Sequence, residues 1–163
     1  MRTLHRIAGM AALGLIATFW IASAAVEVTG SREAVATVKE GIAWGLLLLV
    51  PSVISANASG MREARRRTPM GRGLPPLLAR KQRRGIIVAV LGLTVLAPCA
   101  LWLAWRASQT GALGATFHAV QGVELAGGAI NFVLLALNAR DGYRMRKPAR
   151  TVPSGVVPAR GDA

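Results

Sequence analysis

The 163-residue sequence contains a single cysteine, few aromatic residues and few acidic side chains. Because Cys99 stands alone, no disulfide can form within one chain, and the residue carries no information on the redox compartment. The sequence has 7 Asp and Glu residues and 20 Lys and Arg residues, which gives a formal charge of +13. It also lacks a Walker-type phosphate loop, a dinucleotide-binding glycine pattern, a Gly-x-Ser-x-Gly motif and paired CxxC motifs. With no such signature present, we expect a protein that is not an enzyme.

Long apolar segments make up most of the chain, which is 53% hydrophobic with a mean hydropathy of +0.43. A membrane-spanning helix needs about 20 mainly apolar residues, and four segments meet this requirement. They are approximately residues 4–28, 34–56, 86–105 and 115–139. A composition both apolar and basic is typical of proteins whose apolar segments lie in lipid and whose cations lie in the connections. The sequence therefore predicts an all-α integral membrane four-helix bundle within residues 1–146.

The distribution of positive charge predicts how the spans are oriented. All but three of the 20 Lys and Arg residues lie at the N-terminus, in a basic cytoplasmic loop at residues 57–85, or after the fourth span. These segments fall on one side of an up-down-up-down arrangement, which predicts that both termini are cytoplasmic. The frequent Ala, Gly and Arg are common in bacterial chains, so we expect a multi-pass protein of the bacterial cytoplasmic (inner) membrane. Residues 147–163, rich in Pro and Arg, predict a disordered cytoplasmic tail.

The first apolar segment has a second interpretation. It follows a basic start and contains an Ala-x-Ala pattern at Ala22 and Ala24, which resembles a cleavable signal peptide. The length of the apolar run favours a retained span, as do Phe19 and Trp20 close to the potential cleavage site. Cleavage would leave three spans and the same orientation for the rest of the chain.

Polar side chains interrupt the second and fourth predicted spans and form a candidate intramembrane polar cluster. Its members are Lys39, Glu40, His118, Gln121, Glu124, Asn131 and Asn138. The amide and carboxyl side chains of the fourth span recur at spacings of three or seven residues and therefore share one helical face, with His118 to one side. A charged side chain in mid-membrane costs about 2.5 to 3.5 kcal/mol. We therefore expect this face to turn away from lipid, with Lys39 and Glu40 opposite it on a neighbouring helix.

Three functions are compatible with this cluster. The main hypothesis is interhelical hydrogen bonding in a structural, accessory or partner-binding membrane protein. The alternative is a small transporter or a proton- or ion-conducting protein that uses Lys39, Glu40 and Glu124. A cofactor- or metal-binding redox subunit ranks third, because His5 and His118 lie at opposite ends of their spans and cannot share one haem. No Glu-x-x-His pair supports a carboxylate-rich metal site either, so we expect no cofactor.

The basic connection predicts contact with anionic lipid headgroups. The candidate side chains are Arg65, Arg66, Arg67, Arg83 and Arg84. The segment has no aromatic residue for stacking on bases and no recognisable nucleic-acid-binding fold, so we expect no nucleic acid partner. Membrane lipids are the expected partners, and another membrane protein or a second copy of the chain is a further candidate.

Proline and glycine positions make local predictions about the spans. Pro51 and Pro98 are expected to bend their helices, since each removes a backbone donor within an apolar helix. Gly41 and Gly45 form a small-residue pattern that is suited to close helix packing.

Three blocks of the sequence resemble a family of small four-span bacterial membrane proteins whose function is uncharacterised. The blocks are VKEGIAWGLLLLVPSVISANASG, KQRRGIIVAVLGLTVLAPCALWLAWRA and FHAVQGVELAGGAINFVLLALNARDGYRMR. The likeness covers about three quarters of the chain and is most specific from Lys39 to Pro51 and around Gln121–Glu124, Asn131 and Asn138. It implies an inner-membrane protein with cytoplasmic termini and brings no activity. At His118 the family usually has an aromatic residue, which weakens a ligand role for this histidine.

Overall fold

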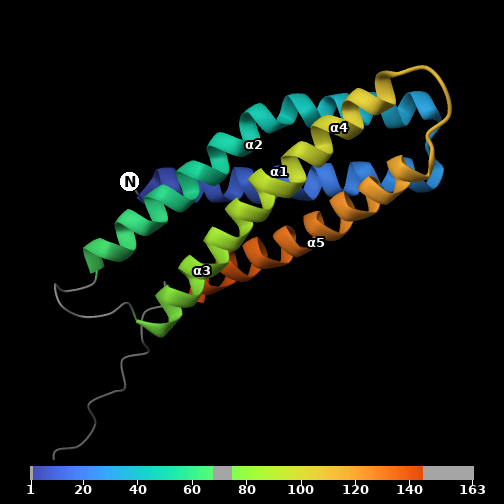
Figure 1. Cartoon of the computed structure of the whole chain (residues 1–163). Helices are drawn as coiled ribbons and strands as arrows, with labels where there is room; N and C mark the ends of the chain where they lie inside the picture. Colours follow the sequence, from blue (N-terminus) through green and yellow to red (C-terminus); the bar gives the residue numbers. More distant parts are fainter. Residues whose placement is uncertain (1, 68–74, 145–163) are drawn as a thin grey trace, which may run out of the picture.

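The computed structural model describes residues 2–67 and 75–144, and these residues are helical except for short connections. The elements are α1 (Arg2–Thr29), α2 (Arg32–Arg67), α3 (Pro76–Leu91), η1 (Gly92–Leu96), α4 (Ala97–Ser108) and α5 (Ala115–Arg144). α3, η1 and α4 follow one another without a break and form one long helix (Figure 1). The described residues thus contain four helices that are long and apolar enough to cross a membrane. This confirms the predicted all-helical class and supports four membrane spans.

The four candidate spans follow the predicted order, but their helices extend further at one end. α2 continues to Arg67 and the third long helix begins at Pro76, so much of the segment 57–85 is helical instead of a loop. Hydropathy identifies the part of a helix that suits lipid and does not mark where the helix ends. Ala, Arg, Met and Glu, which are frequent after residue 57, are strong helix formers. The predicted tail at residues 147–163 lies outside the described residues.

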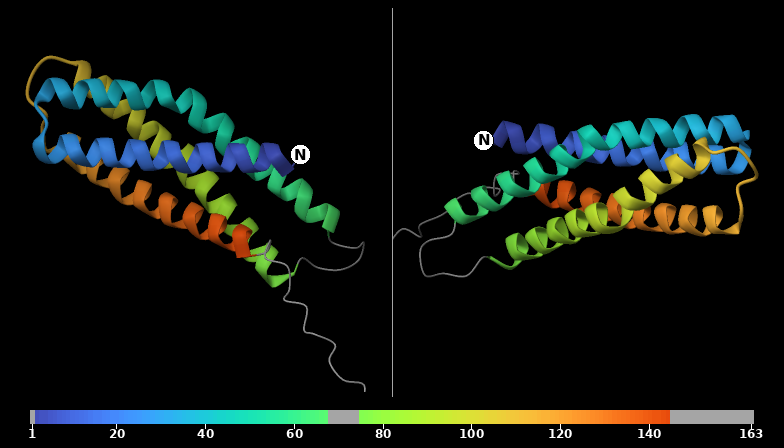
Figure 2. Two further views of the ribbon diagram at one scale, coloured as in Figure 1. Left: turned by 180° about the vertical axis from the view of Figure 1, so that it is seen from behind. Right: turned by 45° about the horizontal axis from the view of Figure 1, so that its top comes forward.

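The two short connections lie at the same end of the molecule, to the right in Figure 1, and we call this the turn end. The N-terminus, the last turns of α2 and the start of α3 lie toward the opposite end, which we call the basic end (Figures 1 and 2). α1 packs against α2 and α5. The third long helix crosses the bundle, so that α4 packs mainly against α2 and α3 mainly against α5.

Local sequence explains the two connections at the turn end. Between α1 and α2, Ser31 caps the second helix, since its side-chain oxygen accepts a hydrogen bond from the amide of Ala34 at 3.3 Å. The connection between α4 and α5 contains Gly111 with φ of 108°, a backbone conformation that favours glycine. Both connections are short, so the helices that they join lie next to each other.

The predicted proline bends correspond to two features of the structure. α2 contains Pro51 and changes direction along its length (Figure 1). In the third long helix, the wide π turn of η1 ends at Leu96, and the amide of Ala97 donates to the carbonyl of Gly92, one residue before Pro98. Such π turns bend helices and are frequent at functional sites.

Two apolar clusters form the core and lie on either side of the middle of the bundle. The cluster toward the turn end consists of Val35, Leu103, Ala107 and Phe117. The cluster toward the basic end consists of Ala12, Val53 and Val88. Polar side chains and a cavity lie between them, and this layer contains most of the sequence-predicted cluster.

Candidate functional site

The centre of the polar layer is Lys39, whose side chain is 0% exposed. Val35 and Ile42, one turn before and after it on α2, are also buried, so the apolar face of the helix carries Lys39 into the bundle. The ammonium nitrogen of Lys39 donates to the hydroxyl oxygen of Ser23 on α1 at 3.0 Å. It also forms an ion pair with the carboxylate of Glu124 on α5. One side chain therefore connects three of the four long helices.

The ion pair with Glu124 neutralises the charge of Lys39 in the interior of the bundle. The Glu124 side chain is 12% exposed, so water barely reaches either partner. Removing one member of such a pair leaves the other charge unpaired and costs about 3 to 5 kcal/mol. The pair also crosses the bundle, because α2 and α5 are separated by the other two long helices. Lys39, Ser23 and Glu124 thus fix the rotation of their helices.

The amides of α5 face the interior, as the periodicity predicted. The side chain of Asn131 is buried and its nitrogen donates to the carbonyl of Val88 on α3 at 3.4 Å. Two helical turns further along α5, the side-chain nitrogen of Asn138 donates to the carbonyl of Lys81 at 3.3 Å. Gln121 is buried as well, but neither of its side-chain polar atoms has a hydrogen-bond partner among the described residues. The two asparagines therefore join α5 to the third long helix by hydrogen bonds, whereas the Gln121 side chain makes no hydrogen bond to another described residue.

Glu40 does not lie where we expected it. The prediction that it faces Glu124 in the interior is wrong, because its side chain is exposed on the outer surface of α2. Neighbouring residues on a helix point about 100° apart, so α2 cannot turn both Lys39 and Glu40 inward. The rotation that buries Lys39 between Val35 and Ile42 directs Glu40 away from the bundle. The Glu40 side chain takes part in none of the hydrogen bonds or ion pairs that the structure contains within residues 2–67 and 75–144.

His118 also lies outside the interior cluster. Its side chain is exposed at the turn end, where Nδ1 lies 2.8 Å from the Oε1 atom of Glu27 on α1. Glu27, His118 and Arg32 line an open depression at this end of the bundle. His118 is therefore a surface residue that joins α5 to α1 when its ring is protonated.

The basic end contains a second, partly buried ion pair that the sequence did not lead us to expect. Arg84 Nη1 lies 2.8 Å from Asp141 Oδ2 and joins α3 to α5. Arg84 was expected at lipid headgroups and is instead held within the bundle. Arg65, Arg66 and Arg83 are exposed, and the side chain of Arg67 lies outside the described part of the chain.

Two members of the site could have been found from weak sequence signals. Ser23 is a hydroxyl residue within the apolar first span, at a depth similar to that of Lys39. Asp141 follows Asn138 by three residues and so continues the polar face of α5. A lone serine in an apolar helix and an aspartate near a helix end do not by themselves indicate a buried contact, so the sequence alone does not single out either residue.

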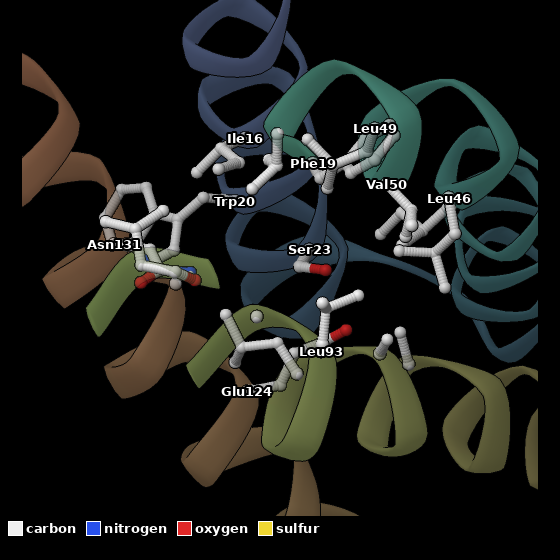
Figure 3. Close-up of a pocket in the computed structure, with 18 of the residues that line it drawn as sticks. Ile16, Phe19, Trp20, Ser23, Leu46, Leu49, Val50, Leu93, Glu124 and Asn131 are labelled. Carbon is white, nitrogen blue, oxygen red and sulfur yellow. The ribbon is translucent and has the colours of Figure 1, made fainter. Parts of the chain in front are cut away.

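A cavity of about 80 Å³ lies between the four long helices, next to Glu124 and on the side of the ion pair that faces the basic end. Figure 3 shows Ser23, Glu124 and Asn131 around the same space as apolar side chains such as Ile16 and Leu93. Pockets for drug-sized ligands are usually about 300 to 1,000 Å³, so this cavity is too small for a haem. Since one water needs at least about 10 to 15 Å³ of such space, several waters fit between Glu124 and Asn131.

The described residues give no direct support to a metal centre. Within residues 2–67 and 75–144, no three His, Cys, Asp or Glu side chains come together in a way that could hold a metal ion. Cys99 is partly buried on α4. The buried polar groups of the described residues are instead ion pairs, the Ser23 hydroxyl that accepts from Lys39, and amides, of which Asn131 contacts a backbone carbonyl and Gln121 has no partner.

The fold and this site define an all-helical chain with four candidate membrane-spanning helices and a polar layer between them. In comparisons with protein-family models, curated proteins and solved structures, nothing matches the chain. The resemblance to a family of small four-span proteins therefore stays a prediction from the three sequence blocks.

Proposed function

We propose that this chain is a non-enzymatic structural, accessory or partner-binding component of the bacterial inner membrane. The proposal includes an up-down-up-down path with both termini in the cytoplasm. The basic end then faces the cytoplasm, in accord with the positive charges there, and the turn end faces outward. Membership in the family of small four-span proteins is part of the same proposal.

The observation that carries the proposal is the buried contact of Lys39 with Ser23 and Glu124. The ammonium group has a hydrogen-bond acceptor on α1 and a counter-charge on α5. A carboxylate that carries protons or ions must change partners in every cycle, whereas Glu124 is held by a cation that is itself fully buried. The contact therefore favours a role in holding the helices together over a role in transfer across the membrane.

The test compares wild type with charge-removed and charge-exchanged chains by two measurements. One is ion flux in reconstituted vesicles, and the other is accumulation of the protein in cells. We expect wild type to give no proton or ion flux above protein-free vesicles. Lys39→Met should lower accumulation in cells because Glu124 loses its partner, and the exchange Lys39→Glu with Glu124→Lys should restore much of it. A flux that wild type supports, and that Glu124→Gln abolishes in a folded protein, would contradict the proposal.

A conducting function is the second candidate, and one observation favours it. Unpartnered atoms of Gln121 and Asn131 lie on α5 on either side of Glu124, and the cavity next to Glu124 has room for water. Such a path would use Lys39 and Glu124 but not Glu40, which is outside the bundle. A pH-sensitive dye inside the vesicles, with a potassium gradient to set the voltage, distinguishes this function from the first.

The proposed orientation has a separate test. In a Cys99→Ala background, single cysteines at Gln109 and at Arg65 report on the turn end and the basic end. A membrane-impermeant maleimide added to intact spheroplasts should label the first position and not the second. Labelling of the cysteine at Arg65 without lysis would overturn the proposed orientation and leave the four helices unaffected.

A further inference from the structure

The outer surface of α2 presents a carboxyl group within the candidate span. Glu40 is exposed and lies eight residues after Arg32, about 12 Å from the start of the helix at about 1.5 Å per residue. Carboxyl groups that face hydrocarbon are rare in membrane helices because water no longer solvates them. The side chain is also too short to reach the headgroups from this depth. Some other group is needed to solvate it.

The residues around Glu40 suit contact with another helix. Gly41 is exposed, and a side chain added there would meet no atom within 4 Å, so a second backbone can approach closely. Gly45, its partner in the predicted small-residue pattern, is used inside the bundle instead, where it contacts Phe19 of α1. Trp44 and Leu47 are exposed on the same side of α2 as Glu40. We call Glu40, Gly41, Trp44 and Leu47 the Glu40 face.

We propose that the Glu40 face binds a transmembrane helix of a different membrane protein, and that this helix carries a Lys or Arg side chain at the depth of Glu40. This inference rests on the proposed partner-binding function. The basic side chain would neutralise Glu40, Gly41 would allow close approach, and Trp44 and Leu47 would supply apolar contact area. α1, α3 and α4 occupy the other sides of α2, so no helix of the described residues covers this face.

Charge complementarity argues against a second copy as the partner. Within the described ranges, no exposed cation lies at the depth of Glu40. Lys39 is buried and already paired, and Arg32 and Arg106 donate to the carbonyls of Gln109 and Ala112 at the turn end. A symmetric contact through Gly41 would bring two Glu40 carboxylates together. A helix of another protein that carries a cation can neutralise Glu40, whereas the described residues of a second copy of this chain offer no such cation.

The experiment uses the full chain in vesicles with defined guest helices. The guests are Leu/Ala transmembrane peptides that differ only in one residue, Lys, Leu or Glu, at about eight residues from the outer end. Energy transfer between a labelled chain and a labelled guest measures association. Interhelical polar contacts in membranes change association by about three- to thirtyfold, so the Lys guest should bind that much more tightly than the Leu guest.

Variants of Glu40 assign this preference to the proposed contact. Glu40→Gln should bring the Lys guest close to the Leu guest, and Glu40→Lys should transfer the preference to the Glu guest. Glu33→Gln is the matched control, because Glu33 is exposed on the same helix but at its end, where water reaches it. Equal binding of the three guests, or a Glu33→Gln effect as large as that of Glu40→Gln, overturns the inference.

A photo-crosslinking residue at position Trp44 tests the contact in cells. The inference predicts a crosslinked product that disappears in Glu40→Gln and whose second component has a basic residue within its span. A Glu40-dependent product of twice the 17.1 kDa chain means a dimer and overturns the inference. If native mass spectrometry finds a complex that persists in Glu40→Gln, the proposed function stands and this inference fails. If no complex is found and no guest is preferred, the inference fails together with the partner-binding part of the proposed function.

Discussion

Two ion pairs join α5 to other helices of the bundle, and they lie in different surroundings. Lys39 and Glu124 are 0% and 12% exposed and meet in the middle of the bundle. Arg84 and Asp141 are 17% and 9% exposed and meet toward the basic end. The interaction between charges and the cost of an unpaired charge both grow as water is excluded. The two carboxylates are similarly buried, so the pairs differ in the burial of the cation and in their place in the bundle. We therefore expect a larger effect from losing the mid-bundle pair.

A third pair extends the comparison to the surface. His118 and Glu27 are 56% and 26% exposed at the turn end, where water can replace either partner. Surface ion pairs contribute about 0 to 1 kcal/mol. The cations of the three pairs thus form a series of rising exposure, from Lys39 through Arg84 to His118. We expect the cost of losing the pair to fall along this series.

Removing the charge of Lys39 should have the largest effect in this series. We expect Lys39→Met to destabilise the protein by about 3 to 5 kcal/mol, because Glu124 stays buried without a counter-charge. Unfolding in mixed micelles measures the change. The double variant Lys39→Met with Glu124→Leu should recover most of the stability, since apolar pairs often replace buried ion pairs without loss. A single variant as stable as wild type would show that the pair is not structural.

Removing Arg84 should have an intermediate effect. Arg84→Met removes the closer partner of Asp141, at 2.8 Å. Arg140 stays 3.9 Å from Asp141 Oδ1, and headgroups and water near the basic end can also solvate the carboxylate. We expect a loss of about 1 to 2 kcal/mol in the same unfolding assay, roughly the range of a hydrogen bond to a charged group. A loss equal to that of Lys39→Met would remove the distinction between the two surroundings.

Replacing Gln121, also in the polar layer, should change the stability in the opposite direction. Its buried amide has no partner among the described residues, so Gln121→Leu removes a polar group that was buried without compensation. We expect a stabilisation of up to about 1 kcal/mol, because an apolar side chain of similar size is favoured at such a position. Gln121→Glu is the informative control, since it should destabilise. Destabilisation by leucine would mean that the amide binds water or a ligand.

The exposed pair should show the smallest effect. Glu27→Gln is expected to change stability by less than about 1 kcal/mol at any pH between 5 and 8. Chemical denaturation of wild type and variant at pH 5.5 and pH 8 checks this expectation. A loss at pH 5.5 as large as that of Arg84→Met would show that the turn end is less accessible to water than its exposure indicates.

Much of the fold could be predicted from local features of the sequence. Four apolar segments of spanning length, and the placement of cations between them, identify the helices and their order. The three- and seven-residue spacing of the α5 amides predicts that Asn131 and Asn138 face inward, as they do. The cap at Ser31 and the special backbone of Gly111 follow from residue type.

The site itself was predictable only in part. The sequence placed Lys39 and Glu124 in one cluster but did not pair them with each other. It did not single out Ser23 or Asp141, and it placed Glu40 in the interior. Each of these points depends on how one helix is rotated against another. That rotation follows from the packing of all four helices at once, which no local spacing encodes.

The sequence by itself determined which segments suit lipid and which face of α5 is polar, because hydropathy and helical period are properties of neighbouring residues. Only the tertiary structure decided that Lys39 turns inward and Glu40 outward. The two residues are adjacent, and a helix separates them by about 100°, so burying one exposes the other. The burial of Val35 and Ile42 against the bundle sets the rotation of α2 that turns Lys39 inward.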